Sequence, residues 1–157
     1  MNRIMNRISK VQTYFNVARD IAKRGTCLRR NFGAVIVKND RIVSTGYTGS
    51  VRGSDHCCDR GICRREELEV PAGERYELCR SLHAEMNAII QATMEEMEKA
   101  SLFLVGVSQQ THDTLYDYEP CLLCKRMIIN AGISLVYIES FIDGYREIEV
   151  KGWVSIL

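Results

Sequence analysis

Residues 81–90 read Ser81-Leu-His-Ala-Glu-Met-Asn-Ala-Ile-Ile90, and their residue types are explained by a second segment, Glu119-Pro-Cys-Leu-Leu-Cys-Lys125. Together they contain H-x-E at positions 83–85 and P-C-x-x-C at positions 120–124. The imidazole of His83 and the thiolates of Cys121 and Cys124 make three ligands, the usual set for a zinc ion that keeps its fourth position open. The glutamate of H-x-E is then free to move protons for whatever occupies that position.

Both ligand-bearing stretches are predicted to begin helices. Apolar residues at helical spacing predict a helix that starts at its cap, Ser81, runs to about Lys99 and holds His83 in its first turn. The segment 121–130 is predicted to form a second helix, with Pro120 at its start. The apolar stripe of the first helix consists of Leu82, Met86, Ile89, Ile90 and Thr93.

The spacing of these residues suits catalysis. Cys121 and Cys124 are three positions apart, so one helical turn points both sulfurs at one ion, and a helix N-terminus favours the thiolate form. Zinc lowers the pKa of a bound water to about 7, which provides hydroxide at neutral pH. Glu85 is well placed to take the water proton and deliver it to the substrate. The alternative is a structural zinc, but such sites are usually closed by four protein ligands.

The order of the remaining elements predicts an α/β fold. Runs rich in β-branched residues predict strands, and apolar residues at helical spacing predict helices, in the order α-β-β-α-β-α-β. This order indicates a sandwich with one sheet covered by helices. The expected elements are a helix from Ser9 to about Arg24, a hairpin over 33–46, the helix to Lys99, a strand over 102–105, the helix over 121–130, a strand over 133–138 and a weak final strand near 147–150.

Size and composition indicate an ordinary globular protein. A chain of 157 residues is most simply one domain over 1–157, and its apolar and charged fractions, 46% and 26%, are typical. The net charge of +1 gives no sign of the basic surface that tracks a polynucleotide, so we expect no nucleic-acid partner. No stretch is long enough to span a membrane, and the N-terminus lacks the apolar core of a signal peptide, so we expect a cytoplasmic protein without a membrane partner.

Residues 48–80 form an irregular, cysteine-rich insert that needs an ordering principle. The chain has seven cysteines, and an odd number argues against a complete disulfide framework. A structureless segment this long is unusual inside a domain, and a second metal ion is an economical way to order it. The alternative is a set of buried free thiols. The candidate ligands are Cys27, His56, Cys57, Cys58, Cys63 and Cys79.

Several sequence blocks, together with the paired motifs, resemble the deoxycytidylate deaminases of the cytidine deaminase superfamily. The resemblance implies a three-layer α/β/α sandwich with a mixed central sheet. It implies hydrolysis of dCMP to dUMP and ammonia, with zinc-bound hydroxide attacking C4 of the cytosine ring and Glu85 as proton shuttle. It further implies a homo-oligomer, often a hexamer, and control by the effectors dCTP and dTTP with Mg²⁺. The blocks that carry it are 26–37, 44–49, 73–80, 83–90 and 120–132.

The resemblance also suggests substrate-binding residues. The family holds the deoxyribose with an asparagine where this chain has Thr48, a departure that leaves the choice among cytosine nucleotides open. Arg52 and one of Arg29 or Arg30 resemble the family's phosphate-binding arginines, and a guanidinium suits a phosphate because it can bind two oxygens at once. A solvated surface arginine is the alternative for each. Tyr118 precedes the second motif, where its ring would either stack on the base or pack on the protein.

The resemblance bears on the second metal as well. Some members carry a second, structural zinc, and here it favours Cys27, Cys63 and Cys79 with one of His56, Cys57 or Cys58 as ligands.

Other functions fit the same motif. Within the superfamily the rivals are a deaminase of another cytosine nucleotide, nucleoside or free base, a tRNA adenosine deaminase, and the deaminase of riboflavin synthesis. The tRNA enzyme would need a more basic surface, the riboflavin enzyme is commonly fused to a reductase, and a nucleoside enzyme would not need the arginines. From another class, the chain would be a catalytically silent, zinc-containing nucleotide sensor. The intact Glu85 counts against a sensor, because a binding protein has no use for a proton shuttle.

Overall fold

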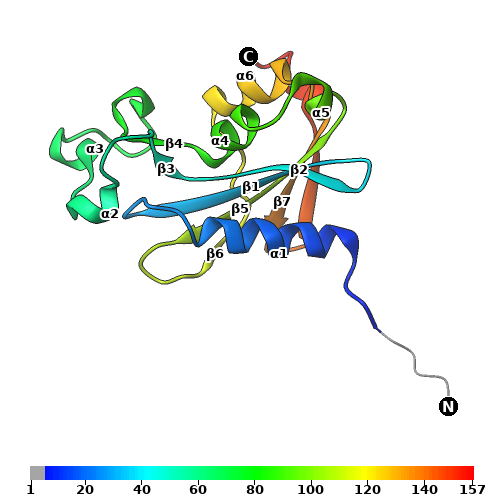
Figure 1. Ribbon diagram of the computed structural model, residues 1–157, viewed down its shortest axis with the longest axis horizontal. Helices are drawn as coiled ribbons and strands as arrows, with labels where there is room; N and C mark the ends of the chain where they lie inside the picture. The colour runs from blue at the N-terminus through cyan, green and yellow to red at the C-terminus, as the bar shows by residue number, and fades with distance from the viewer. Residues whose placement is uncertain (1–5) are drawn as a thin grey trace.

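A mixed sheet lies at the centre of the computed structural model, which describes residues 6–157 (Figure 1). Its main path is β2-β1-β5-β7-β8, and the short β6 pairs with β5. Strands β5 and β7 are parallel, whereas the other neighbouring pairs are antiparallel. The strands are β1 (Arg30–Lys38), β2 (Arg41–Tyr47), β5 (Ser101–Ser108), β6 (Thr114–Leu115), β7 (Leu135–Ser140) and β8 (Gly144–Glu149).

Helix α1 (Lys10–Ala22) covers one face of the sheet (Figure 1). Its N-cap is Ser9, as expected, and the Ser9 hydroxyl oxygen accepts a hydrogen bond from the backbone N–H of Gln12 at 3.1 Å. Phe15 and Ala18 are buried against apolar side chains of β1 and β5. The helix lies directly on Gly33 of β1, because a Cβ at that position would be 2.0 Å from the carbonyl oxygen of Ala18.

The opposite face is covered by α4 (Ala84–Ile90), α5 (Met94–Met97), α6 (Leu122–Asn130) and the 3₁₀ helix η2 (Val150–Trp153) (Figure 1). These elements share the larger core cluster with β1, β5 and β7. Here α4 lies on Gly46 of β2, where a Cβ would be 2.3 Å from the carbonyl oxygen of Ala84. With a helical layer on each face, the expected three-layer α/β/α sandwich with a mixed sheet is confirmed.

The prediction of a single helix from Ser81 to Lys99 is wrong. Residues 81–82 form strand β4, and the N-cap of α4 is His83. Helix α4 ends at Ile90, and a second helix, α5, begins after a new N-cap, Thr93. The two helices are separate because Thr93 and Glu96 form a capping box, in which each side chain accepts a hydrogen bond from the other residue's backbone N–H.

The insert is closed at its base by two short antiparallel strands, β3 (Gly49–Ser50) and β4 (Ser81–Leu82). Between them lie short helical turns: α2 (Cys57–Arg60), α3 (Arg64–Glu67) and the 3₁₀ helix η1 (Tyr76–Leu78). The insert extends from one end of the sheet, at the left of Figure 1. The segment predicted as an irregular insert thus contains three short helical turns between two short strands.

The C-terminal strand β8 starts earlier than the expected 147–150 and pairs with β7 at the edge of the sheet. Within residues 6–157, none of the helices combines the length and the apolar character needed to cross a membrane.

Candidate active site

The three expected metal ligands meet where α4 and α6 begin. His83 is the N-cap of α4, Cys121 is the N-cap of α6, and Cys124 lies in the first turn of α6. The Nδ1 atom of His83 is 3.5 Å from Sγ of Cys121 and 3.3 Å from Sγ of Cys124. Among residues 6–157, these are the only three potential ligand atoms of His, Cys, Asp and Glu that all lie within 4.8 Å of one another. This geometry suits one small metal ion.

The local electrostatics favour a thiolate at this position. The pKa of Cys121 is lowered to about 4, mainly by a hydrogen bond from Cys124. His83 lowers it further, and the two effects together outweigh burial, which raises it. The pKa of Cys124 is raised, because its proton is held by Cys121 and its side chain is buried. Burial lowers the pKa of His83, but the interactions with Cys121 and Glu85 outweigh it and the net shift is upward. A thiolate next to an imidazole is a strong donor pair for zinc.

Glu85 lies in the first turn of α4 and is only 4% exposed. Burial is the main cause that raises its pKa, the charge of Cys121 adds to the increase, and His83 opposes it. A carboxyl group whose pKa is shifted toward neutrality can take up and return a proton at physiological pH.

A cavity of about 220 Å³ opens onto His83, Glu85 and Cys121. Four of the five expected substrate-binding residues line it, namely Arg29, Arg30, Thr48 and Tyr118. The fifth, Arg52, is exposed after β3 and does not line the cavity.

Thr48 is buried at the end of β2, and its hydroxyl oxygen accepts a hydrogen bond from the backbone N–H of Phe32 at 3.0 Å. The backbone of Thr48 also donates to the carbonyl oxygen of Phe32. The hydroxyl therefore holds the end of the β1–β2 hairpin and keeps its proton and one lone pair for a ligand.

Arg30 and Arg29 each contact a side chain from another part of the chain. The guanidinium of Arg30 lies over the ring of Tyr118 at 5.1 Å from the ring centroid, and Tyr118 is also near Phe32. Arg29 makes an ion pair with Glu66 of α3 at 3.6 Å. These contacts link residues 29–30 to the insert and to the segment before α6.

Arg65 of α3 is a lining residue that the substrate-binding prediction missed. It is 7% exposed and forms no ion pair within residues 6–157. One amino group of its guanidinium donates to the carbonyl oxygen of Pro71 at 3.0 Å, while the buried Nε has no partner. The guanidinium lies over the ring of Tyr76, which in turn packs edge-on against the imidazole of His83 at 5.0 Å between ring centroids. The arginine-rich sequence around it was the only available signal.

The candidate ligands of a second metal are near one another without forming a closed set. Cys27, Cys63 and Cys79 line the cavity. The pKa of Cys57 is raised, mainly by burial and then by the neighbouring thiols of Cys27, Cys79 and Cys63. His56 has a buried Nδ1 without a partner. Cys58, by contrast, is exposed.

A family model described as the cytidine and deoxycytidylate deaminase zinc-binding region matches residues 8–140. The chain belongs to this family. The resemblance inferred from the motif blocks is therefore confirmed.

Curated relatives include ComE operon protein 2 of Bacillus subtilis, which is 34% identical over 85% of this chain and 60% of its own length. The deoxycytidylate deaminase of Schizosaccharomyces pombe is 32% identical over 82% of this chain and 36% of its own length. The chain thus spans less than two thirds of these two family members. The deoxycytidylate deaminase of Mycobacterium phage D29 is 31% identical over 84% of this chain, and the match covers 95% of the phage protein.

Two solved structures have a similar fold. The dCMP deaminase of cyanophage S-TIM5 in its apo form is 24% identical, covers 85% of each chain and has a TM-score of 0.54. The cytidine deaminase of Burkholderia pseudomallei is 17% identical, covers 90% of this chain and 93% of its own, and has a TM-score of 0.58.

Proposed function

We propose that this chain is a zinc-dependent hydrolase that converts dCMP and water to dUMP and ammonia. The observation that carries the proposal is the meeting of His83, Cys121 and Cys124 with the buried Glu85 in one cavity. A purely structural zinc site would not need a buried carboxyl beside an open cavity.

The donor set fits zinc. One imidazole nitrogen and two sulfurs within 4.8 Å of one another match the ligand types and the three-ligand count of a catalytic zinc site. His83, Cys121 and Cys124 would hold the ion. When bound, zinc supplies a nucleophile at neutral pH by lowering the pKa of a water molecule to about 7.

Glu85 would carry the protons of the reaction. Its carboxylate takes a proton from the attacking water and gives it to the ring nitrogen N3 of cytosine, so that negative charge does not build up on the ring. It then takes the second proton of that water from the new hydroxyl on C4 and delivers it to the departing amino group, which leaves as ammonia, while C4 becomes a carbonyl. Both transfers need a carboxyl with a pKa shifted toward neutrality, as burial provides here.

The phosphate of the substrate would be held by Arg29, Arg30 and Arg65, which share the cavity with the metal-ligand set. Guanidinium groups bind phosphate through charge-assisted hydrogen bonds. The relatives named deoxycytidylate deaminase, in particular the phage D29 protein that the match covers almost completely, support a nucleoside monophosphate as substrate. Arg52, outside the cavity, would contribute only if a ligand extended beyond it.

The nucleoside part would lie between Thr48 and Tyr118. Thr48 would donate its hydroxyl proton to the deoxyribose, and Tyr118 would stack on the base. Because Thr48 replaces the family's asparagine, the competing substrates are other cytosine nucleotides and deoxycytidine.

The deciding experiment is an ammonia-release panel over dCMP, dCTP, CMP, deoxycytidine and dAMP, each repeated with dCTP or dTTP and Mg²⁺ as effectors. We expect the highest kcat/KM with dCMP. A higher kcat/KM with deoxycytidine would overturn the phosphate assignment, and no turnover of any cytosine compound would overturn the enzymatic function.

Three further parts of the proposal concern the whole protein. We propose a homo-oligomer, with the hexamer as the expected form, control by dCTP and dTTP, and a cytoplasmic setting. We also propose a second, structural zinc in the insert, held by Cys27, Cys63 and Cys79 with one of His56, Cys57 or Cys58. The neighbouring thiols around Cys57 and the orphaned Nδ1 of His56 support this second site.

A further inference from the structure

The segment 116–121 joins β6 to α6 without forming a helix or a strand of its own. It carries Tyr118 and Glu119, which line the cavity, immediately before Pro120 and the ligand Cys121. Asp117 has a positive φ of 58°, a conformation that is uncommon outside glycine. The backbone N–H of Asp117 donates to the carbonyl oxygen of Glu139 of β7 at 2.8 Å, and side-chain contacts on either side of Tyr118 hold the rest of the segment.

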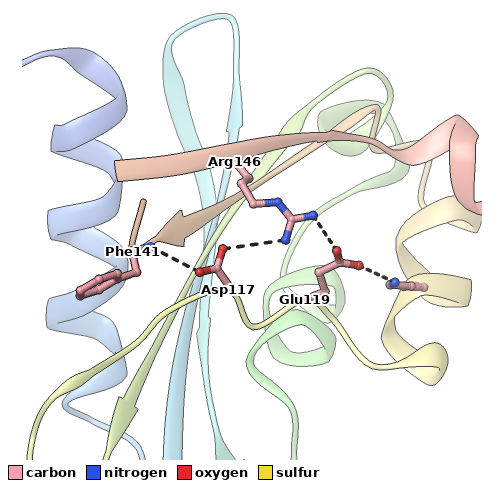
Figure 2. A network of polar contacts seen from close by, with 5 residues as sticks. Asp117, Glu119, Phe141 and Arg146 are labelled. Carbon is pink, nitrogen blue, oxygen red and sulfur yellow. Dashed lines mark hydrogen bonds and ion pairs between the residues drawn. The ribbon is translucent and has the colours of Figure 1, made fainter. Parts of the chain in front are cut away.

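All four carboxylate oxygens on either side of Tyr118 have partners. Arg146 of β8 donates to Oε1 of Glu119 at 2.9 Å and forms an ion pair with Oδ1 of Asp117 at 3.9 Å. Oε2 of Glu119 accepts a hydrogen bond from Lys125 of α6 at 2.7 Å, and Oδ2 of Asp117 accepts one from the backbone N–H of Phe141 at 3.3 Å. Figure 2 shows Arg146 reaching down from its strand between the two carboxylates.

Arg146 is the one side chain of this network that contacts both carboxylates, as Figure 2 shows. It does not line the cavity. Its side chain is 43% exposed, and those of Asp117 and Glu119 are 42% and 33% exposed. Ion pairs as exposed as these contribute little to global stability. Their effect is local, because they add two side-chain anchors to a segment whose backbone is attached to β7 by the hydrogen bond from the N–H of Asp117 to the carbonyl oxygen of Glu139 at 2.8 Å.

Because Tyr118 lies between Asp117 and Glu119 and lines the cavity, the contacts of Arg146 also affect the position of this ring. In the sequence, Tyr118 lies between Asp117 and Glu119, which both contact Arg146. In space, the guanidinium of Arg30 lies over the ring of Tyr118, 5.1 Å from the ring centroid. A shift of Asp117 and Glu119 would move Tyr118 and remove the surface on which Arg30 rests. The metal ligands would be less affected, since Cys121 is also held as the N-cap of α6.

We propose that Arg146 is a positioning residue that holds Tyr118 and Glu119 at the cavity and so sets the affinity for the substrate. The inference rests on the proposed function, because the substrate taken for the kinetic test is dCMP. Its structural part, the ordering of segment 116–121 by Arg146, does not depend on that function.

The test compares Arg146→Ala with Arg146→Lys in the full chain loaded with zinc. For Arg146→Ala we expect KM for dCMP to rise about three- to tenfold, with kcat within twofold of the parent and zinc per chain unchanged. Arg146→Lys keeps the charge but loses the planar fork that reaches two carboxylates, so we expect an intermediate KM. Amide hydrogen exchange in peptides covering 115–120 should become faster in Arg146→Ala and remain near the parent rate elsewhere in the sheet.

Two further variants make the test specific. Lys151→Ala removes an exposed cation that pairs with Glu149 in the same C-terminal region, and it should change neither KM nor exchange in 115–120. Asp117→Asn suits the positive φ and removes the ion pair of Asp117 with Arg146. Combining it with Arg146→Ala should therefore raise KM less than the product of the two single effects.

Parent-like exchange and KM in Arg146→Ala would overturn the proposal, and so would a fall in kcat accompanied by loss of zinc, which would place the effect on Cys121 instead. If the parent protein does not deaminate dCMP, the proposed function fails, and the exchange rates alone then decide whether Arg146 orders the segment.

Discussion

Glu85 is buried beside the three potential metal ligands, and its pKa is raised mainly by that burial. Glu85→Gln keeps the shape of the side chain but cannot take up or return a proton. We expect kcat for dCMP to fall by about 10²–10⁴, the usual contribution of a general acid–base group, with zinc per chain unchanged. Glu95→Gln on the exposed side of α5 is the matched control. A fully active Glu85→Gln protein would contradict the assigned role.

Arg65 is a buried guanidinium with no carboxylate partner among the described residues, and this suits it to an anionic ligand. A hydrogen bond to a charged group contributes about 1.5–3 kcal/mol. That free energy corresponds to roughly a 10- to 100-fold change in affinity. We therefore expect Arg65→Gln to raise KM for dCMP by about this factor and to leave KM for deoxycytidine nearly unchanged.

The control for Arg65 is Arg60→Gln, which removes an exposed arginine of the same insert that pairs with Asp55. It should affect neither substrate. Equal losses for dCMP and deoxycytidine in Arg65→Gln would show that Arg65 supports the site without contacting a phosphate.

The metal ligands could be predicted from the sequence, whereas the arginines of the cavity could not be told apart from the others. His83, Cys121 and Cys124 could be predicted as a set, because the ligand types and their spacing on two helices already restrict them to one ion. Arg52 and Arg65 could not be ranked in the same way. Both lie in arginine-rich, irregular sequence, and only the folded insert shows that Arg65 is buried at the cavity whereas Arg52 is exposed.

At the scale of elements, the helices were predicted better than their ends. The stripe from Leu82 to Thr93 suggested one helix to Lys99, yet Ile90 is 64% exposed and marks the end of α4. The start of α5 was readable in principle, because Thr93 and Glu96 have the spacing of a capping box. Hydrophobic periodicity continues across such a break, and therefore did not reveal it.

The contact between β2 and α4 gives a prediction for this pair of elements. A Cβ on Gly46 would lie 2.3 Å from both the carbonyl oxygen of Ala84 and the backbone nitrogen of Ala88. Because these are backbone atoms, Gly46→Ala must push α4 away from the sheet. We expect a loss of about 1–3 kcal/mol in the free energy of unfolding, the usual cost of overpacking, measured by urea denaturation.

The control is Gly152→Ala, since a Cβ there meets no atom within 4 Å. The same shift would displace His83 and Glu85 at the start of α4, so Gly46→Ala should also lower kcat. Stability and kcat like those of Gly152→Ala would show that α4 does not depend on this close approach.

At the scale of the whole molecule, the α/β class followed from the order of predicted elements, but the arrangement of the strands did not. The sheet path β2-β1-β5-β7-β8 pairs β5 with β7 in parallel and places β8 at the edge. Pairing between strands that are far apart in the sequence depends on the long-range fit of the two helical layers. No local pattern in the chain encodes that fit.

A hydrogen bond between the last two strands of the sheet should make the folded protein less stable at alkaline pH. Tyr137 of β7 donates a hydrogen bond to Glu147 of β8. Burial is the main cause that raises the pKa of Tyr137 to about 12, and Glu147 adds to it. In the unfolded chain a tyrosine has a pKa of about 10, so the folded state holds the proton more tightly. This contribution to stability is complete below about pH 10 and is lost as pH rises toward about 12. Tyr137→Phe should reduce the fall in urea midpoint over that range, and an unchanged fall would exclude Tyr137 as the cause.

The second proposed zinc affects the whole insert, which has few regular elements and a cluster of thiols around Cys57. If it binds, metal analysis of the protein purified without chelator should give two zinc ions per chain. Cys63→Ser should then retain one zinc, held by His83, Cys121 and Cys124. Limited proteolysis within 51–80 should become faster, because the short helices of the insert lose the ion that connects them. One zinc per chain in the parent protein would remove the second site. The insert would then be held by the β3–β4 pair, the Arg29–Glu66 ion pair and the packing of its buried thiols.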